Sequence, residues 1–137
     1  MKLKPYGHGF GALNIHIVFV TKYRHPVITA EIESRLKSIM AKLCETQKCT
    51  LLECKADVGS NDQIHLLVEM APDIALSKLV NILKTIISRE IRKEFRDFLK
   101  HYYWKPVFWK RGYGFVSVGG VPLKTLKEYI EHQGYND

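Results

Sequence analysis

Two strand-like segments separated by four turn-forming residues constrain the fold of this chain more than any other feature. Residues 51–58 and 63–70 are rich in strand-forming residues, and Gly59-Ser60-Asn61-Asp62 between them is typical of a turn. A link of this length favours an antiparallel hairpin. On the second strand, Gln63 and His65 are two residues apart, so both side chains should point to the same face of the sheet.

Two longer segments have the 3.6-residue periodicity of helices that cover a sheet. The first follows Thr29, a suitable N-cap, and the second starts near Pro72-Asp73, with Asp73 as the expected N-cap, and runs to about Leu99. The apolar stripe of the first helix is Ile32, Leu36, Ile39, Met40 and Leu43. The second helix carries Leu76, Val80, Leu83, Ile87, Ile91, Phe95 and Phe98 on one face and Lys78, Arg89, Arg92, Lys93, Arg96 and Lys100 on the other.

The remaining segments complete the order strand, helix, strand, strand, helix, strand, helix. Residues 13–21 should form a central strand, 114–118 a fourth strand, and 123–133 a short helix that follows the Gly119-Gly120 turn and ends at Gly134. We therefore expect an α+β fold: a ferredoxin-like, RRM-like four-stranded antiparallel sheet with two packing helices and a short C-terminal helix. A length of 137 residues favours one domain, 1–137.

The composition narrows the class of protein. With 46% hydrophobic residues the chain should be globular, and neither a membrane span nor the apolar core of a signal peptide is visible, so we expect a cytoplasmic protein. Cys44, Cys49 and Cys54 have no CxxC spacing. They favour buried or idle thiols over a disulfide framework or a zinc site.

The positive charge is concentrated in one region. Residues 84–111 hold nine Lys and Arg side chains against three acidic ones, which is nearly the whole net charge of +7. Aromatic residues are interleaved with these cations: Tyr102, Tyr103, Trp104, Trp109 and Tyr113. This combination suits a phosphate backbone with stacked bases, although a solvated helix face followed by a core hairpin would have the same pattern.

A second pair of polar residues lies near the end of the chain. Tyr129 and Gln133 are four apart in a segment with helical periodicity, which places a hydroxyl and an amide one turn from each other. Together with Gln63 and His65 they would give a nucleophile and three possible metal ligands from two elements. Each residue alone has an ordinary structural explanation, such as a half-buried histidine or an amphipathic helix residue.

Three motifs in order resemble the single-tyrosine transposases of the HUH-endonuclease superfamily, which belong to insertion sequences that move as single-stranded DNA. They are Ile17-Val18-Phe19-Val20-Thr21-Lys22-Tyr23-Arg24, Asp62-Gln63-Ile64-His65-Leu66-Leu67-Val68, and Gly119-Gly120-Val121 followed by Leu126-Lys127-Glu128-Tyr129-Ile130-Glu131-His132-Gln133. Trp109-Lys110-Arg111-Gly112-Tyr113 is also similar to the family's segment before the last core strand. The likeness extends from about Leu13 to Gln133.

The resemblance implies a mechanism and a set of roles. Tyr129 matches the nucleophile that attacks a DNA phosphodiester to give a 5′-phosphotyrosine and a free 3′-hydroxyl, while His65, Gln133 and Gln63 match the ligands of a divalent metal, Mg²⁺ or Mn²⁺. It further implies single-stranded DNA with hairpin ends as the partner and a homodimer with shared active sites, hinged at Gly119-Gly120. The residues expected to contact DNA are Lys22, Arg24, Arg89, Arg92, Lys93, Arg96, Lys110 and Arg111.

The chain departs from the family motif at one position. The family has histidine on both sides of the apolar residue, whereas this chain has Gln63 at the first place. An amide oxygen is still an acceptable ligand for Mg²⁺ or Mn²⁺. Two alternatives therefore stay open: a non-catalytic nucleic-acid-binding module of the same fold, and an inactivated copy of the enzyme. Tyr135 competes with Tyr129 as nucleophile, and His16 and His132 are further candidates for the site.

Overall fold

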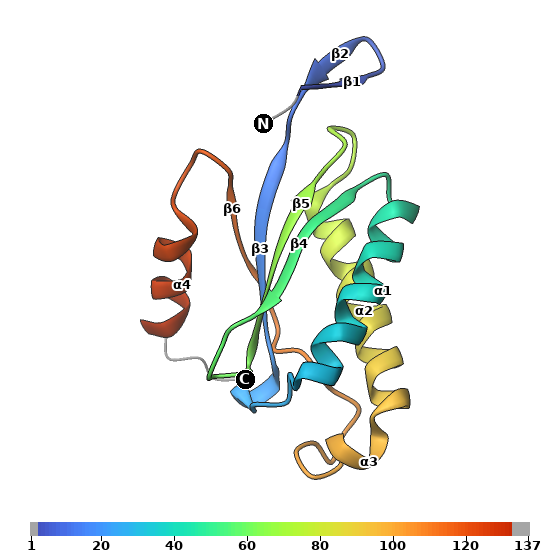
Figure 1. The fold of residues 1–137 in the computed structure, drawn as a ribbon, viewed down its shortest axis with the longest axis vertical. Helices are drawn as coiled ribbons and strands as arrows, with labels where there is room; N and C mark the ends of the chain where they lie inside the picture. Colours follow the sequence, from blue (N-terminus) through green and yellow to red (C-terminus); the bar gives the residue numbers. More distant parts are fainter. Residues whose placement is uncertain (1–2, 133–137) are drawn as a thin grey trace.

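The computed structural model describes residues 3–132 and confirms the α+β fold class (Figure 1). Its main strands are β3 (Asn14–Val20), β4 (Thr50–Ala56), β5 (Gln63–Glu69) and β6 (Gly114–Ser117). Its helices are α1 (Ala30–Thr46), α2 (Leu76–Glu94), α3 (Arg96–Leu99) and α4 (Leu123–His132). The strands form an antiparallel sheet in the order β4-β5-β3-β6, so each of the two crossovers, through α1 and α2, skips one strand as in ferredoxin-like folds.

Two short elements were not anticipated from the sequence. Strands β1 (Lys4–Tyr6) and β2 (Gly9–Gly11) form a separate hairpin that projects beyond one end of the sheet (Figure 1). A 3₁₀ turn, η1 (Lys22–Arg24), follows β3 at the opposite end. Both elements are too short to produce a periodic sequence signal.

The first helix forms as the sequence predicts. The backbone N–H of Ile32 donates to the Thr29 hydroxyl at 3.2 Å, which satisfies one of the unpaired donors of the first turn. Ile32, Leu36 and Met40 are completely buried against the sheet. The predicted cap and apolar stripe are thus both confirmed.

The predicted start of the second helix was wrong, and the helix is not continuous to its predicted end near Leu99. Pro72 and Asp73 form a turn closed by the N–H of Ile74 and the carbonyl of Ala71 at 3.2 Å, and α2 begins only at Leu76 without a side-chain cap. Proline is as suitable for the second position of a turn as for a first helical turn, so the pattern was ambiguous. The helix also breaks at Phe95, where ψ is 34°, and the short α3 then brings Leu99 into the core.

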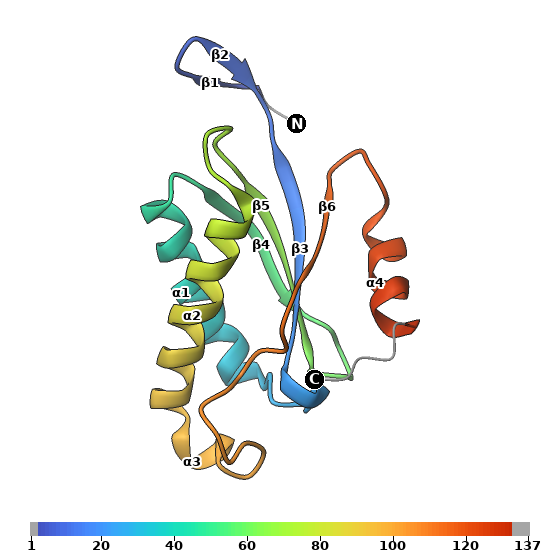
Figure 2. The same ribbon diagram turned by 180° about the vertical axis from the view of Figure 1, so that it is seen from behind.

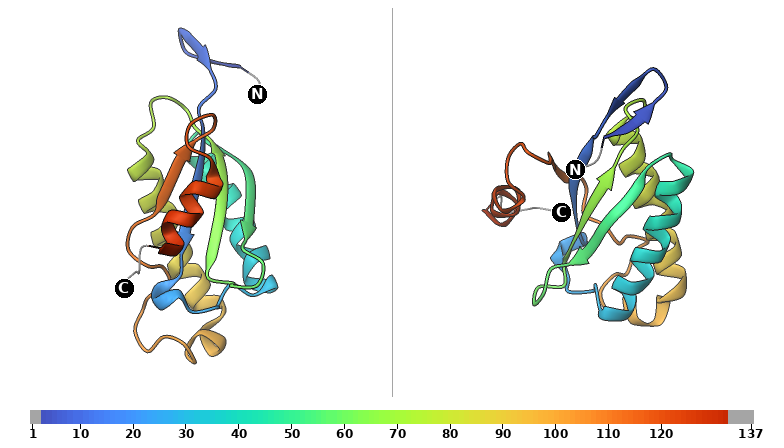
Figure 3. Two further views of the ribbon diagram at one scale, coloured as in Figure 1. Left: turned by 90° about the vertical axis from the view of Figure 1, so that its left-hand side faces the viewer. Right: turned by 45° about the horizontal axis from the view of Figure 1, so that its top comes forward.

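The two faces of the sheet are covered differently. Helices α1 and α2 lie side by side on one face, and α4 lies alone on the other (Figures 1, 2 and 3). The first face holds the main core, in which Ile17, Phe19 and Leu66 are completely buried. On the second face, Val18, Val20 and Ile130 form a separate small cluster, with Leu123 and Leu126 packed against it.

A glycine on β6 permits the close approach of α4. A Cβ atom at Gly114 would lie 2.8 Å from Leu126 Cδ1 and 3.2 Å from Ile130 Cδ1. These separations are shorter than ordinary contacts between carbon atoms. The helix that carries Tyr129 therefore rests directly on backbone at this point.

Candidate active site

The candidate site lies on the α4 face of the sheet. In the register of β3 and β5, Gln63 pairs with Val20 and His65 pairs with Val18, and both valines pack against α4. Paired residues of antiparallel strands share a face. Gln63 and His65 therefore both point toward α4, as the two-residue period predicts.

His65 contacts a second histidine. Its Nε2 lies 2.8 Å from Nδ1 of His16, so one ring donates a hydrogen bond to the other, and His65 is 7% exposed. Burial, with smaller contributions from the nearby His16 and Lys127, lowers the pKa of His65 to about 4. At neutral pH its imidazole is uncharged, which is the form that ligates metals.

Gln63 is held by α4 through one end of its amide only. Nε2 donates to Oε1 of Glu131 at 2.8 Å, and the side chain is 1% exposed. Its Oε1 is buried and has no hydrogen-bond partner among the described residues. An unsatisfied buried acceptor is costly, and a divalent cation is one group that could satisfy it.

Glu131 is a residue of the site that sequence reasoning did not assign. Besides the amide of Gln63, its carboxylate accepts a hydrogen bond from Arg24 at 2.8 Å, and Arg24 also donates to Asp62 at 2.9 Å. The Arg24 guanidinium lowers the pKa of Glu131. Lys127 reaches Asp57 at 2.9 Å from the same helix, so two side chains of α4, Lys127 and Glu131, hold it by polar contacts. In the sequence, only the four-residue spacing of Lys127 and Glu131 indicated that the two side chains lie on the same side of the helix.

Tyr129 occupies a different side of α4. Its side chain is 61% exposed, whereas its neighbour Ile130 is 1% exposed. Tyr129 makes no hydrogen bond within residues 3–132. Gln133 and the competing Tyr135 lie outside the described residues. The structure thus brings His65 and Gln63 together and leaves the predicted roles of Tyr129 and Gln133 as predictions.

The side chains of Gln63 and His65 offer two possible ligands for a divalent cation such as Mg²⁺ or Mn²⁺. No group of three or more His, Cys, Asp or Glu side chains that could hold a metal occurs within residues 3–132. The neutral imidazole of His65 and the unpaired oxygen of Gln63 are nevertheless ligand types that Mn²⁺ accepts, and the oxygen suits Mg²⁺ as well. These two side chains therefore fit a divalent cation chemically.

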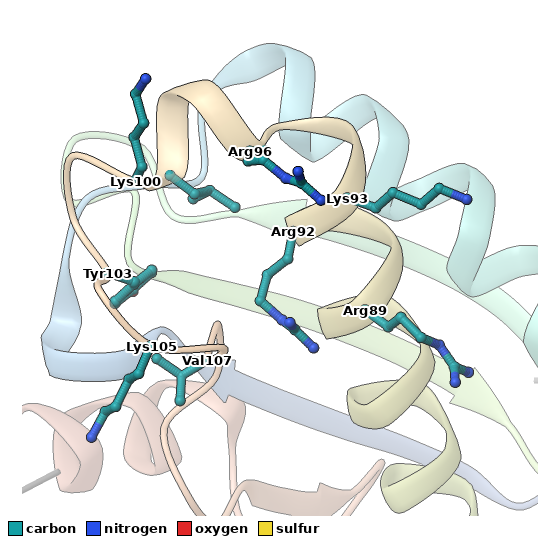
Figure 4. Close-up of a pocket in the computed structure, with 9 residues that line it drawn as sticks. Arg89, Arg92, Lys93, Arg96, Lys100, Tyr103, Lys105 and Val107 are labelled. Atoms are coloured by element: carbon teal, nitrogen blue, oxygen red, sulfur yellow. The ribbon is translucent and has the colours of Figure 1, made fainter.

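The predicted DNA-binding residues fall into two groups. Arg89, Arg92, Lys93 and Arg96 line one cavity of about 350 Å³ at the end of α2, on the far side of the sheet from α4 (Figure 4). Lys22, Arg24, Lys110 and Arg111 do not line this cavity. Two of them, Arg24 and Lys110, are engaged in contacts within the protein or buried. Arg24 is paired with two carboxylates, and the side chain of Lys110 is only 8% exposed. Contact of these residues with DNA stays a prediction.

The three cysteines belong to the main core and not to the site. All are free and buried. Burial raises the pKa values of the Cys44 and Cys54 thiols to about 12 and also raises that of Cys49. No helix within residues 3–132 has the length and apolar character needed to cross a membrane.

Comparison with known proteins identifies the family. The family model described as "Transposase IS200 like" matches residues 10–133. The transposase for insertion sequence element IS200 of Salmonella typhimurium is 36% identical over 86% of this chain and 74% of its own length, and the ISDra2 transposase TnpA of Deinococcus radiodurans is 26% identical over 88% and 84%. A crystal structure of a presumed transposase from Deinococcus radiodurans R1 superposes with a TM-score of 0.79 at 26% identity, covering 99% of this chain and 100% of that one. On this match over nearly its full length, the chain belongs to the IS200-like transposases.

Proposed function

We propose that this DNA-processing enzyme cleaves and rejoins single-stranded DNA at insertion-sequence ends, using Tyr129 as the nucleophile. The observation that carries the proposal is the arrangement on the α4 face. His65 and Gln63 lie buried beneath the same helix that presents Tyr129, and Gln63 keeps an oxygen without a partner among the described residues. A tyrosine, a neutral imidazole and an amide oxygen could supply the nucleophile and two metal ligands of such a reaction.

The reaction is a transesterification. Tyr129 Oη bonds to the phosphorus and loses its proton, the bond from phosphorus to the 3′-oxygen breaks, and that oxygen takes up a proton as a 3′-hydroxyl. One phosphodiester bond replaces another, so a second 3′-hydroxyl can reverse the step and join new strands. No nucleotide hydrolysis is needed, in agreement with a sequence that lacks a phosphate-binding loop.

The residues of the sheet face have supporting roles. Held at Gln63 and His65, with Gln133 as a further ligand, Mg²⁺ or Mn²⁺ would neutralise the charge of the scissile phosphate. Glu131 holds the amide nitrogen of Gln63, which leaves the amide oxygen available, and His16 holds the ring of His65. The hydrogen bond between the two rings also holds the neutral form of His65, since two protonated imidazoles would repel each other.

The exposure of Tyr129 favours a shared site. A side chain that is 61% exposed and hydrogen-bonds to no described residue is available to a second molecule. We propose a homodimer in which the Tyr129 of one subunit serves the His65 of the other, with Gly119-Gly120 as the hinge. Gly119 has a φ of 90°, which only glycine adopts without strain.

The test is covalent capture of DNA. Wild-type protein incubated with single-stranded oligonucleotides of the element ends and Mn²⁺ should give a shifted band in denaturing electrophoresis. Tyr129→Phe should abolish the band and retain hairpin binding, and Tyr6→Phe, on the distant β1, should leave both unchanged. Adducts that persist in Tyr129→Phe would eliminate Tyr129 as the nucleophile. DNA binding by the wild type without any adduct would support the non-catalytic alternative.

A further inference from the structure

An exposed aromatic group lies at the end of the molecule opposite the β1–β2 hairpin. The Trp104 side chain is 87% exposed and that of Tyr23 is 42% exposed. Lys105 Nζ lies 5.5 Å from the centroid of each ring, and Lys22 Nζ lies 5.3 Å from that of Tyr23. We call Tyr23, Trp104 and Lys105 the aromatic platform. Two exposed rings grouped with cations, unlike a single exposed ring such as Phe10, are typical of an interaction surface.

The backbone that presents Tyr23 is strained. Tyr23 and Arg24 have φ values of 58° and 54°, in the left-handed region that side chains other than those of Asn and Asp rarely adopt. Each such residue has an energetic cost, and strain of this kind persists where the surroundings enforce it, often at functional sites. Here the result is that the Tyr23 ring is partly exposed while the next residue, Arg24, pairs with the buried Asp62 and with Glu131.

A basic cavity adjoins the platform. Six of its nine lining residues are cations and none of the nine is acidic: Arg89, Arg92, Lys93, Arg96, Lys100 and Lys105 (Figure 4). Arg89, Lys93 and Arg96 form no ion pair within residues 3–132. Such a concentration of positive charge in a hollow is unfavourable unless an anion neutralises it, and the several charges suit consecutive phosphates better than one.

Two residues connect the cavity, the platform and the candidate active site. Lys105 lines the cavity and lies over both rings of the platform. Tyr103 also lines the cavity, and its hydroxyl donates to the Lys22 carbonyl at 2.8 Å, which ties the cavity wall to η1. From η1, Arg24 leads directly to Glu131 and Gln63. A series of contacts thus links the three sites around the end of the sheet where η1 lies.

We propose that this path binds the unpaired strand that leads to the cleaved phosphodiester, with bases stacked on Trp104 and Tyr23 and phosphates in the basic cavity. Stacking rings and cations are the two elements of sequence-independent single-strand binding. In a duplex the base faces are already stacked and cannot reach the rings. The proposal rests on the proposed function, because it supplies the track for its single-stranded substrate.

The platform is tested with a labelled (dT)12 probe and a blunt 12-base-pair duplex. Trp104→Ala should weaken (dT)12 binding about 5- to 100-fold and leave duplex binding unchanged, because each stacked base contributes a large share of single-strand affinity. Trp104→Phe, which keeps a ring, should restore most of the affinity. Phe10→Ala is the matched control, since Phe10 is also an exposed aromatic residue (78%) but lies at the opposite end.

Intrinsic fluorescence gives an independent readout. Trp109 is 8% exposed and packs against Phe19 and Phe108, so only Trp104 should respond to a stacked base. Saturating (dT)12 should quench the emission of the wild type and not that of Trp104→Phe. Wild-type affinity in Trp104→Ala, or equal quenching in Trp104→Phe, would refute the platform.

The cavity is tested by salt dependence. Arg92→Gln combined with Arg96→Gln should reduce the slope of log K against log salt by roughly 0.7 for each phosphate that the protein no longer neutralises. Lys78→Gln, an exposed charge at the other end of α2, should leave the slope unchanged. An unchanged slope in the double variant would remove the cavity from the path.

The outcome is separable from that of the proposed function. If the wild type forms no adduct but Trp104 still governs (dT)12 binding, the catalytic proposal fails and the platform stands. If adducts form and depend on Tyr129 while Trp104→Ala binds (dT)12 normally, the platform fails and the catalytic proposal stands.

Discussion

The two faces of the sheet use the same strands for opposite purposes. On β5, Ile64, Leu66 and Val68 are completely buried beneath α1 and α2, while the alternate residues Gln63 and His65 point to α4. The first face is an uninterrupted apolar core, and the second has a small apolar cluster beside polar groups. The apolar packing and the polar residues of the candidate site thus lie on opposite sides of one strand, and substitutions on the two sides should have separable effects.

The largest expected effect is on the formation of covalent adducts by a site that combines Tyr129 of one subunit with His65 of the other. Tyr129→Phe and His65→Ala should each abolish covalent adducts, and mixing the two variants should restore adduct formation, because one composite site then contains both intact groups. The measurement is adduct yield after subunit exchange. Failure of the mixture, although each variant folds and exchanges with the wild type, would show that Tyr129 serves the His65 of its own subunit.

The second expected effect is a difference in stability between apolar substitutions on the two faces. Leu66→Ala, in the main core, should reduce the free energy of unfolding by about 2–5 kcal/mol, because apolar burial is reduced and a cavity remains. Leu126→Ala, at a partly buried position under α4, should cost only about 1–2 kcal/mol. Denaturant unfolding measures both. Equal losses would mean that α4 is as firmly attached as the main core.

A third prediction concerns the departure from the family motif. Gln63→His introduces a second imidazole and removes the amide that donates to Glu131. We expect adduct formation to become half-maximal at a Mn²⁺ concentration at least about 10-fold lower, because imidazole is the stronger ligand for this metal. Gln63→Leu is the control that removes the ligand. If Gln63→Leu requires no more Mn²⁺ than the wild type, position 63 does not bind the metal.

The smallest effect concerns the thiols of the main core. Cys44 and Cys54 have pKa values raised to about 12, so they should not react with a thiol reagent at pH 8 until the protein unfolds. The unfolded chain loses these protons near pH 8.5, so the free energy of unfolding should fall as the pH rises from about 8.5 toward 12. Titration of thiols in native and denaturing buffer measures the first effect. Rapid native reaction of two thiols would contradict the burial of these residues.

Local patterns predicted the elements that depend on local interactions. The cap at Thr29, the hairpin of β4 and β5 and the shared face of Gln63 and His65 all follow from spacing within a few residues. The family resemblance supplied the candidate roles. The start of α2 was missed because Pro72 is compatible with both a turn and a helix, and local sequence does not decide between them.

The polar network of the site depended on long-range register and could not be predicted. His16 reaches His65 because β3 and β5 align so that the two residues are diagonal neighbours, 49 positions apart in the chain. Glu131 reaches Gln63 because Gly114 lets α4 approach the sheet. Neither contact has a sequence signature of its own.

The close approach at Gly114 has a consequence for how such enzymes can change. Only a few apolar side chains and the polar contacts of Lys127 and Glu131 attach α4 within residues 3–132, and none of its buried positions belongs to the main core. Mutations that alter how this helix is seated, including any side chain at position 114, therefore leave the core that folds the domain intact. The position of α4 can thus change without loss of the main core, so we expect it to diverge faster than the scaffold beneath it.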